Sequence, residues 1–219
     1  TSGSAVPPQV STSEANSSRA EAGVLSNPTT SVLFGQDSLD DGNRSGGRFF
    51  ASRELSEIDA AVFVSGLYLA DDYQSGDFVA TSAGLPILAR PFRDAQTQLE
   101  NSELVAFPSV LTGTVAIDSY SELYGAQAGM ANTLLRGTRG KLFLTTGYRF
   151  LSYRDQLAVR EDLRSIDLGG AIPLNTEFVV RDSFEASNSF HGGSLGVGIE
   201  GEHQRWDYAL GASVALGGL

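Results

Sequence analysis

Apolar and polar residues alternate with a period of two along much of the chain. From Lys141 to Phe150 the even positions carry Leu, Leu, Thr, Tyr and Phe, whereas the odd positions carry Lys, Phe, Thr, Gly and Arg. Leu195–Glu200 and Trp206–Gly217 also have an apolar residue at every second position. Because successive side chains of a β-strand point to opposite faces, this pattern predicts strands with one apolar face and one polar or small face.

The alternating segments define six expected strands, all of which follow residue 30. The connections between consecutive strands are alternately short and long, which is typical of an antiparallel up-and-down meander with tight turns at one end and large loops at the other. Several segments exceed the roughly 3–10 residues of strands in soluble proteins and are long enough to cross a membrane at a tilt. The expected strands are Arg48–Glu54, Ile58–Asp72, Gly113–Leu135, Lys141–Val159, Val179–Gly201 and Trp206–Gly217.

The fold class predicted from this pattern is all-β, as the antiparallel up-and-down meander of a transmembrane β-barrel. The meander is incomplete here, because six strands are fewer than the roughly eight that close a small barrel. Residues 1–30 are rich in Ser, Thr, Ala, Pro and Asn, which predicts a flexible lead segment with at most a short helix at Ser13–Val24. Residues 31–219 form the expected outer-membrane barrel domain, and its connection Gln74–Thr112 is large enough to fill a lumen or bind a partner.

Charge and composition narrow the class of protein. The formal net charge of −11 argues against a nucleic-acid partner, because phosphate binding requires a basic surface. The absence of Cys excludes disulfide bonds and thiolate metal sites. No apolar run approaches the roughly 18 residues of a membrane-spanning helix. Hydrophobic residues make up 41% of the chain, which is compatible with a barrel whose strands are polar at every second position.

The alternation also assigns side chains to the two faces of the expected wall. Aromatic residues near the strand ends indicate the interfacial girdles of a membrane barrel, and small or charged residues indicate its lumen. The predicted lumen-lining residues are Lys141, Thr145, Arg149, Glu200, Asp207 and Ser213. The residues predicted to contact lipid or form the girdle are Leu142, Leu144, Tyr148, Phe150, Trp206, Tyr208 and Leu210. A soluble sheet with one wet face would alternate in the same way, so a β-sandwich lectin stays an alternative.

Two glycine- or acid-rich motifs have a structural interpretation that we favour over a binding one. Asp37–Asn43 clusters carboxylates as calcium loops do, but it lacks the EF-hand spacing and the bidentate Glu, and an Asx-rich turn is the simpler interpretation. Gly196–Gly201 fits G-x-G-x-x-G, yet a dinucleotide site needs a helix after that motif. Here the alternation continues on both sides, so we expect these glycines to give room in the barrel wall.

Candidate catalytic and charged residues are interpreted in the same way. His191 and Ser194 would lie on opposite faces of one strand, which argues against a nucleophile pair between them. Glu200 and Glu202 share a face as a hydrolase pair would, and we expect them to face water in the lumen. The recurring arginines could line a pore or lie at anionic lipid headgroups; they are Arg149, Arg154, Arg160 and Arg164. The sequence assigns no catalytic residue, metal ligand or cofactor.

Six ordered segments resemble a family of bacterial outer-membrane proteins, known as putative beta-barrel porin family seven. They include VLFGQDSLDDGNRSGGRF and GYRFLSYRDQLAVREDL, and together cover nearly everything after residue 30. The resemblance implies a multi-stranded outer-membrane barrel that continues past residue 219, so that this chain lacks the last strands. Family members often carry Cys at the turn that is Arg136–Gly140 here, and its absence removes any disulfide there. The segments are Val32–Phe49, Gly84–Phe92, Ser102–Val115, Gly147–Leu163, Phe184–Gly196 and Arg205–Gly217.

The expected function is that of a porin-like passive channel for small solutes or ions in the bacterial outer membrane. Lumen width would set the size limit and wall charges would bias the sign of the permeating ion. A structural or adhesive surface barrel with a filled lumen is the alternative, and an outer-membrane lipid hydrolase using His191 with a Ser from another strand is less favoured. Outer-membrane lipid is the expected partner. The solute and the oligomeric state, a homo-oligomer included, stay open.

Overall fold

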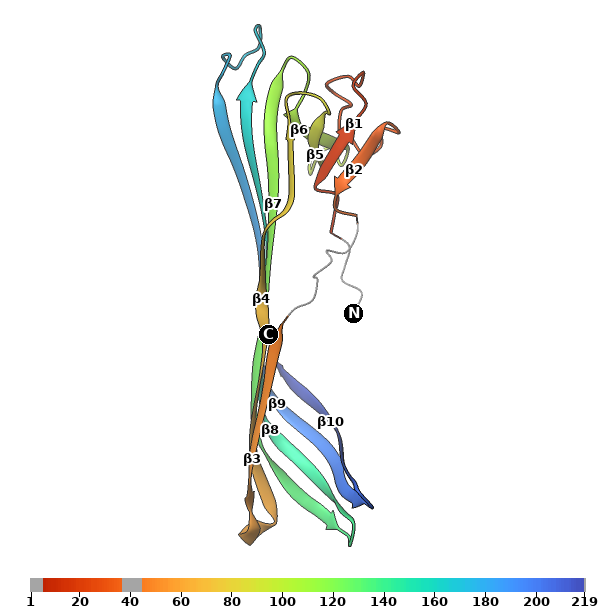
Figure 1. Ribbon diagram of the computed structural model, residues 1–219, viewed down its shortest axis with the longest axis vertical. Helices are drawn as coiled ribbons and strands as arrows, with labels where there is room; N and C mark the ends of the chain where they lie inside the picture. The colour runs from red at the N-terminus through yellow and green to blue at the C-terminus, as the bar shows by residue number, and fades with distance from the viewer. Residues whose placement is uncertain (1–5, 37–44, 219) are drawn as a thin grey trace. The chain divides into compact units, whose positions relative to one another are not determined.

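A computed structural model describes residues 6–36 and 45–218 of the chain, without the side chains of residues 70–77. These residues form two β-sheets, one four-stranded in the order β2-β1-β5-β6 and one six-stranded in the order β10-β9-β8-β7-β4-β3 (Figure 1). Neighbouring strands with a described register, such as β9 with β10 and β3 with β4, run antiparallel. The predicted all-β antiparallel fold is therefore confirmed. Within the described ranges, no helix combines the length and the apolar character needed to cross a membrane.

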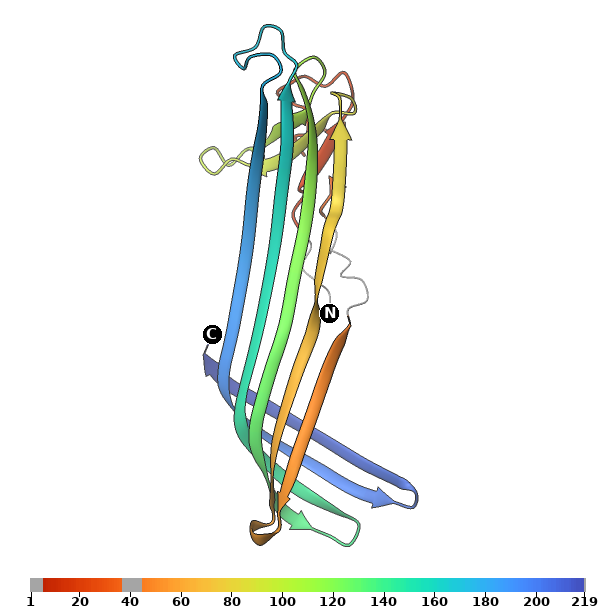
Figure 2. The same ribbon diagram turned by 60° about the vertical axis from the view of Figure 1, so that its left-hand side comes forward.

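The six strands predicted from alternation are all present in the six-stranded sheet, side by side in Figure 2. Most extend beyond their predicted bounds, β4 by the largest margin. Within the described residues the sheet does not close on itself, and β10 and β3 are its edges. The strands are β3 (Gly46–Leu55), β4 (Ala60–Ser82), β7 (Leu111–Arg136), β8 (Gly140–Ser165), β9 (Glu177–His203) and β10 (Trp206–Gly218).

Tight turns join the strand pairs that the sequence predicted to be closely connected. Between β3 and β4 a short 3₁₀ turn, η1 (Ser56–Ile58), ends at Asp59, whose φ of 47° reverses the chain. Between β7 and β8 the amide of Gly137 donates to the carbonyl of Gly140 at 2.8 Å. The β9–β10 turn uses Gln204, which has a φ of 56°. Asp, Asn and a few other polar residues tolerate this left-handed region better than β-branched residues do.

The chain divides into two compact units, and several of the long strands contribute residues to both. Unit 1 comprises the described residues of Thr1–Gly42, Tyr73–Tyr120 and Gln156–Phe184. Unit 2 comprises those of Asn43–Asp72, Ser121–Asp155 and Glu185–Leu219. Unit 1 contains the whole four-stranded sheet, whereas unit 2 is built from the six-stranded sheet alone.

The four-stranded sheet of unit 1 corrects two sequence-based expectations. The expected flexible lead over residues 1–30 contains β1 (Val10–Ser13) and the first residue of β2 (Thr30–Phe34). Turns, rather than the short helix considered at Ser13–Val24, follow β1. The expected long connection Gln74–Thr112 contains the end of β4 together with β5 (Leu88–Arg93) and β6 (Glu100–Ala106). These strands have four to seven residues, too few for a period of two to stand out.

Hydroxyl groups take the place of apolar side chains in β1. Ser11 is fully buried and its hydroxyl donates to the carbonyl of Gly23 at 2.9 Å. Ser13 is also buried, and its hydroxyl accepts from the amide of Gly23 at 2.8 Å. Thr12 donates to the carbonyl of Ile87 at 2.7 Å, which ties β1 to the segment before β5. The Ser and Thr side chains of this polar segment thus form hydrogen bonds with buried backbone groups. Buried backbone groups without a partner would destabilise the fold.

One apolar cluster joins the small sheet to the long strands within unit 1. The small sheet contributes a minority of the buried members, and β7 and β8 contribute the others. The cluster consists of Val10, Leu88, Val105, Ala106, Leu111, Val115, Ile117, Val159 and Leu163. Burying an aliphatic side chain contributes about 1.5–3 kcal/mol, so the cluster fixes the small sheet against β7 and β8.

A buried ion-pair triad ties β5 to β8 and β9 in the same unit. The guanidinium of Arg90 contacts Glu161 at 2.7 Å and Asp182 at 2.6 Å. The side chain of Glu161 is fully buried, and Arg90 is 14% exposed. Burial raises the pKa of the Glu161 carboxyl, and the hydrogen bond from Arg90 partly opposes that effect. Removing the cation would therefore leave a desolvated carboxylate.

We expect Arg90→Met to lower the free energy of unfolding by about 3–5 kcal/mol at neutral pH, since it leaves Glu161 buried without its cation. The loss should shrink toward pH 4, because a carboxyl whose folded-state pKa is raised is stabilising when protonated and loses that contribution as pH rises through its folded pKa. Urea unfolding of the chain in detergent micelles at the two pH values measures both effects.

Two further variants test the origin of the loss. Arg90→Met combined with Glu161→Leu should regain most of the stability, because an apolar pair can replace a buried ion pair at little cost. Arg160→Met breaks the exposed pair of Arg160 with Asp162 and should cost less than about 1 kcal/mol. Equal losses for Arg90→Met and Arg160→Met would contradict the assignment.

Candidate functional site on the six-stranded sheet

In unit 2 the six-stranded sheet has two chemically different faces. The register pairs Ser52 with Phe63 and Glu54 with Ala61 on one face, and Phe49 with Gly66 on the other. We call the first the polar face; its polar members are Arg48, Ser52, Glu54, Gln127, Lys141, Thr145, Arg149, Ser194, Glu200, Asp207 and Ser213. We call the second the apolar face; it includes Phe49, Val62, Val64, Tyr124, Leu134, Tyr148, Leu195, Val197, Ile199, Trp206, Tyr208, Leu210, Val214 and Leu216.

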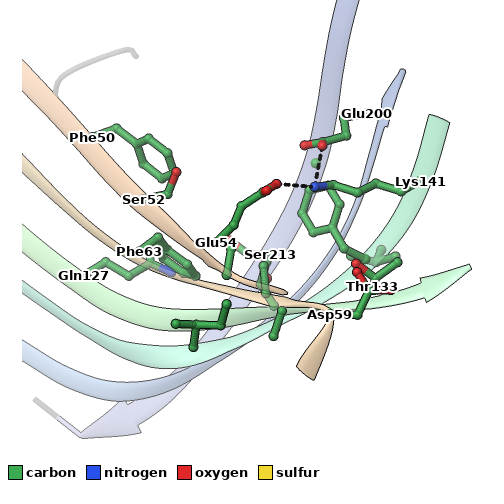
Figure 3. Close-up of a pocket in the computed structure, with 18 of the residues that line it drawn as sticks. Phe50, Ser52, Glu54, Asp59, Phe63, Gln127, Thr133, Lys141, Glu200 and Ser213 are labelled. Carbon is green, nitrogen blue, oxygen red and sulfur yellow. Dashed lines mark ion pairs between the residues drawn. The ribbon is translucent and has the colours of Figure 1, made fainter. Parts of the chain in front are cut away.

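A cavity of about 680 Å³ lies on the polar face and is lined by residues of all six strands. Figure 3 shows its labelled side chains converging from β3, β4 and the strands opposite them. A second cavity of about 560 Å³ lies at the turns, between the β7–β8 turn and the residues around Glu200 and Asp207. The two cavities share Glu54, Arg136, Lys141 and Glu200 in their linings.

Ion pairs across the larger cavity show that the sheet curves around the polar face. The ammonium of Lys141 lies 2.6 Å from Glu200 and 3.5 Å from Glu54 (Figure 3). Lys141 is on β8 and Glu54 is on β3, with β7 and β4 between them. Strands are about 4.8 Å apart, so a flat sheet would separate these two by roughly 14 Å. Side chains that stand perpendicular to a sheet bridge such a gap when the sheet is bent toward them.

A second polar network crosses the sheet farther from the turns. Arg149 donates to Gln127 at 2.8 Å and to Ser213 at 3.1 Å, and Gln127 donates to Ser194 at 3.3 Å. Arg149 on β8 reaches Ser213 on β10 across β9. Gly196 of β9 makes this crossing feasible, because a Cβ at that position would lie 2.5 Å from the Thr145 hydroxyl and 2.7 Å from Cβ of Ser213.

Three phenylalanines interrupt the polar face. Phe50 and Phe63 stack with ring centroids 6.1 Å apart and an interplanar angle of 22°. Phe143 lies over Gly198, where a Cβ would come within 2.3 Å of its ring. The sequence did not indicate a lumen position for these rings, because small or charged residues were the signal for the lumen and phenylalanine is neither. Their position on the lumen side of the alternation was the available signal.

The apolar face is highly exposed for side chains of its kind. Trp206 is 76% exposed and Leu216 is 77% exposed. Toward its other end the face has a cluster of rings, in which the Tyr148 hydroxyl lies 2.5 Å from Nδ1 of His191 and the Phe150 ring centroid lies 4.8 Å from that of His191. Large exposed apolar faces are rare on monomeric soluble proteins and mark a surface that interacts with another protein or a membrane.

The structure brings the six predicted lumen-lining residues to one face. Lys141, Thr145, Arg149, Glu200 and Ser213 line the larger cavity, and Asp207 lines the second. The residues predicted to face lipid have the opposite strand parity, and none of them lines the larger cavity, whereas Tyr208 lines the second; they are Leu142, Leu144, Tyr148, Phe150, Trp206, Tyr208 and Leu210. Their contacts with lipid and the role of the lumen-lining set stay predictions.

The remaining candidate residues have structural surroundings. Ser194 is hydrogen-bonded on the polar face, whereas His191 lies in the ring cluster of the apolar face, so the two do not form a pair. The Gly196–Gly201 run lies within β9, with no helix after it. Arg154 pairs with Glu185 and Arg164 donates to Asn175. The candidate calcium motif Asp37–Asn43 lies outside the described residues.

An antiparallel meander that curves around a polar, cavity-bearing face and exposes an apolar face belongs to the class of β-barrel walls. The model of the family described as Putative beta barrel porin-7 matches the chain over residues 1–219, and the chain belongs to this family. The family resemblance predicted from sequence is therefore confirmed. No curated protein and no solved structure matches the chain.

We expect Gly198→Ala to destabilise unit 2 by about 1–3 kcal/mol, because the new methyl group would overlap the Phe143 ring in a packed position. The measurement is the urea midpoint at which the folded, heat-modifiable gel band disappears. Gly211→Ala is the matched control, since its nearest neighbour would be a carbonyl oxygen at 3.6 Å. In a Phe143→Ala background Gly198→Ala should have little further effect; an undiminished loss there would place the clash elsewhere.

Proposed function

We propose that the chain forms part of a bacterial outer-membrane β-barrel that conducts small solutes or ions passively. The observation that carries this proposal is the division of one curved sheet into an exposed apolar face and a polar, cavity-bearing face. In a membrane barrel the first face contacts lipid and the second faces the water-filled lumen. Solutes would pass according to the width of the lumen and the charges on its wall.

The length of the apolar face supports a membrane span. On β7 it extends from Tyr124 to Leu134, with Asn132 as a polar member, which corresponds to about 33 Å of strand at roughly 3.3 Å per residue. A strand tilt of about 40° reduces that length to about 25 Å, the height of the apolar band of outer-membrane barrels. Aromatic residues lie toward both limits, with Tyr124 and Phe150 in ring contact at one and Trp206 and Tyr208 at the other.

The long strands of unit 1 expose charged side chains next to apolar ones such as Val179. Arg160 and Arg164 on β8 and Arg181 on β9 are exposed, and Arg160 pairs with Asp162. Such charges are costly in a lipid environment. We therefore propose that unit 2 crosses the membrane and that unit 1 lies in the aqueous compartment. Outer-membrane lipid is the proposed partner, and no nucleic acid is expected from a chain with a net charge of −11.

A structural or adhesive barrel with a filled lumen is the second candidate. The observation in its favour is the folded four-stranded sheet of unit 1, which an apolar cluster and the Arg90 triad fix to the long strands. A passive channel needs no catalytic residue, and we propose that the protein is not an enzyme. An outer-membrane hydrolase is not favoured, because the contacts of His191 are the Tyr148 hydroxyl and the Phe150 ring rather than a serine of another strand.

The decisive measurement is the conductance of the complete protein in planar lipid bilayers. We expect the protein to fractionate with the outer membrane, to shift its gel mobility on boiling, and to give discrete conductance steps. A heat-modifiable membrane protein without conductance would favour the filled structural barrel. A soluble protein without a mobility shift would overturn the membrane assignment and favour the sandwich.

We also expect thiol labelling to distinguish the two faces, since the chain has no Cys of its own. Thr145→Cys and Ser213→Cys should react with a charged, membrane-impermeant maleimide in reconstituted vesicles or cells. Leu144→Cys and Leu210→Cys should resist that reagent and react with a lipid-soluble one. Thr145 and Leu144 are matched in depth because they are neighbours on β8, whereas Ser213 and Leu210 lie three residues apart on β10. The reverse pattern would show that the faces are assigned the wrong way round.

A further inference from the structure

Two arginines in the larger cavity carry positive charge that no described carboxylate neutralises. Four cationic side chains line this cavity: Arg48, Arg136, Lys141 and Arg149. Lys141 is paired with Glu54 and Glu200, and Arg136 is paired with Asp59. Arg149 contacts the neutral groups of Gln127 and Ser213. Arg48 and Arg149 form no ion pair with any described residue.

Neighbouring contacts place Arg149 level with Phe50, and Arg48 two residues farther from the turns. Ser52 on β3 pairs with Phe63 on β4. The Phe63 ring lies over Gly129 of β7, and Gly129 is next to Gly147 of β8. Moving two residues away from the turns along β3 and β8 leads to Phe50 and Arg149, and two more along β3 lead to Arg48.

An exposed aromatic ring lies at the same height. Phe50 is 64% exposed although it stacks on Phe63, and Arg48 and Ser52 flank it on the same face of β3. Of the three phenylalanines that line this cavity, Phe50 is the one whose side chain is exposed, and a large exposed apolar side chain is an informative exception. The ring offers a flat apolar surface to a solute in the cavity, and such surfaces associate with other rings by offset stacking.

From this combination we infer the solute class of the cavity: organic anions that carry an apolar ring. The carboxylate or phosphate of the solute would bind Arg149 and Arg48, whose planar guanidinium forks match such groups. The ring of the solute would lie against Phe50. Gln127 and Ser213 hold Arg149 in place, which reduces the ordering cost of binding. This inference rests on the proposed channel function, since it concerns what the lumen wall binds.

The test compares three probes in single-channel recordings of the complete protein in potassium chloride at neutral pH. Benzoate has both a carboxylate and a ring, acetate has the carboxylate alone, and benzyl alcohol has the ring without the charge. Benzoate should reduce the chloride conductance at a concentration about fivefold lower than acetate does, the ratio that ring stacking of ordinary strength produces. Benzyl alcohol should leave the conductance unchanged over the same range.

Matched variants assign the effect to the named residues. In Phe50→Ala, benzoate and acetate should reduce the conductance at the same concentration. Phe49→Ala is the control and should keep the preference for benzoate, because Phe49 is the neighbour of Phe50 on the apolar face and is 61% exposed. Arg149→Gln should raise the concentrations needed for both anions and leave their ratio unchanged. Arg139→Gln, in the β7–β8 turn, is the control for a general loss of positive charge.

The recordings distinguish a failure of the inferred solute class from a failure of the proposed channel function. Absence of conductance in the unchanged protein would overturn the channel function itself. Conductance with equal sensitivity to benzoate and acetate would overturn the inferred solute class and leave the channel intact. A benzoate preference that Phe49→Ala and Phe50→Ala reduce equally would likewise overturn it, because the ring would then act through the bilayer or the fold.

Discussion

The constraint on which this structure depends is the alternation of side chains along a hydrogen-bonded strand. Each residue of the four interior strands of the six-stranded sheet has its backbone groups paired with neighbouring strands, so its side chain has two directions available. A register slip of one residue would move Lys141 into the apolar face and Leu142 into the cavity. The cross-sheet contacts of Lys141 and Arg149 therefore also fix the register, since they form in one of the two arrangements.

Glycines on the concave side of the sheet leave space for side chains of neighbouring strands. Bending a sheet crowds the side chains of its inner face, and Gly129, Gly196 and Gly198 lie where Phe63, Thr145 and Phe143 occupy the space of a missing side chain. Glycine is normally disfavoured in strands because it lacks packing and costs backbone entropy. Here larger neighbours supply the packing across the strand boundary.

The strands and faces of the wall were predictable from sequence because they are long and strictly periodic. Lys141–Phe150 and Trp206–Gly217 carried that signal clearly. The four-stranded sheet was not predictable, since Val10–Ser13 has a single large apolar residue and its Ser and Thr hydroxyls resemble those of an unstructured segment. Ion-pair partners on other strands were not predictable either, because nothing in the sequence near Arg90 indicates Glu161 or Asp182. Phe50 and Phe63 stood out as apolar exceptions to a polar face once their strands were paired.

The apolar cluster of unit 1 has a consequence for the order of folding. Val10, Leu88, Val105 and Ala106 of the small sheet are buried against residues that β7 and β8 supply much later in the chain, such as Val159 and Leu163. Short strands without a core of their own gain little by pairing early. The strands of the small sheet, which come before β7 and β8 in the chain, thus reach their final contacts only after those later strands are available.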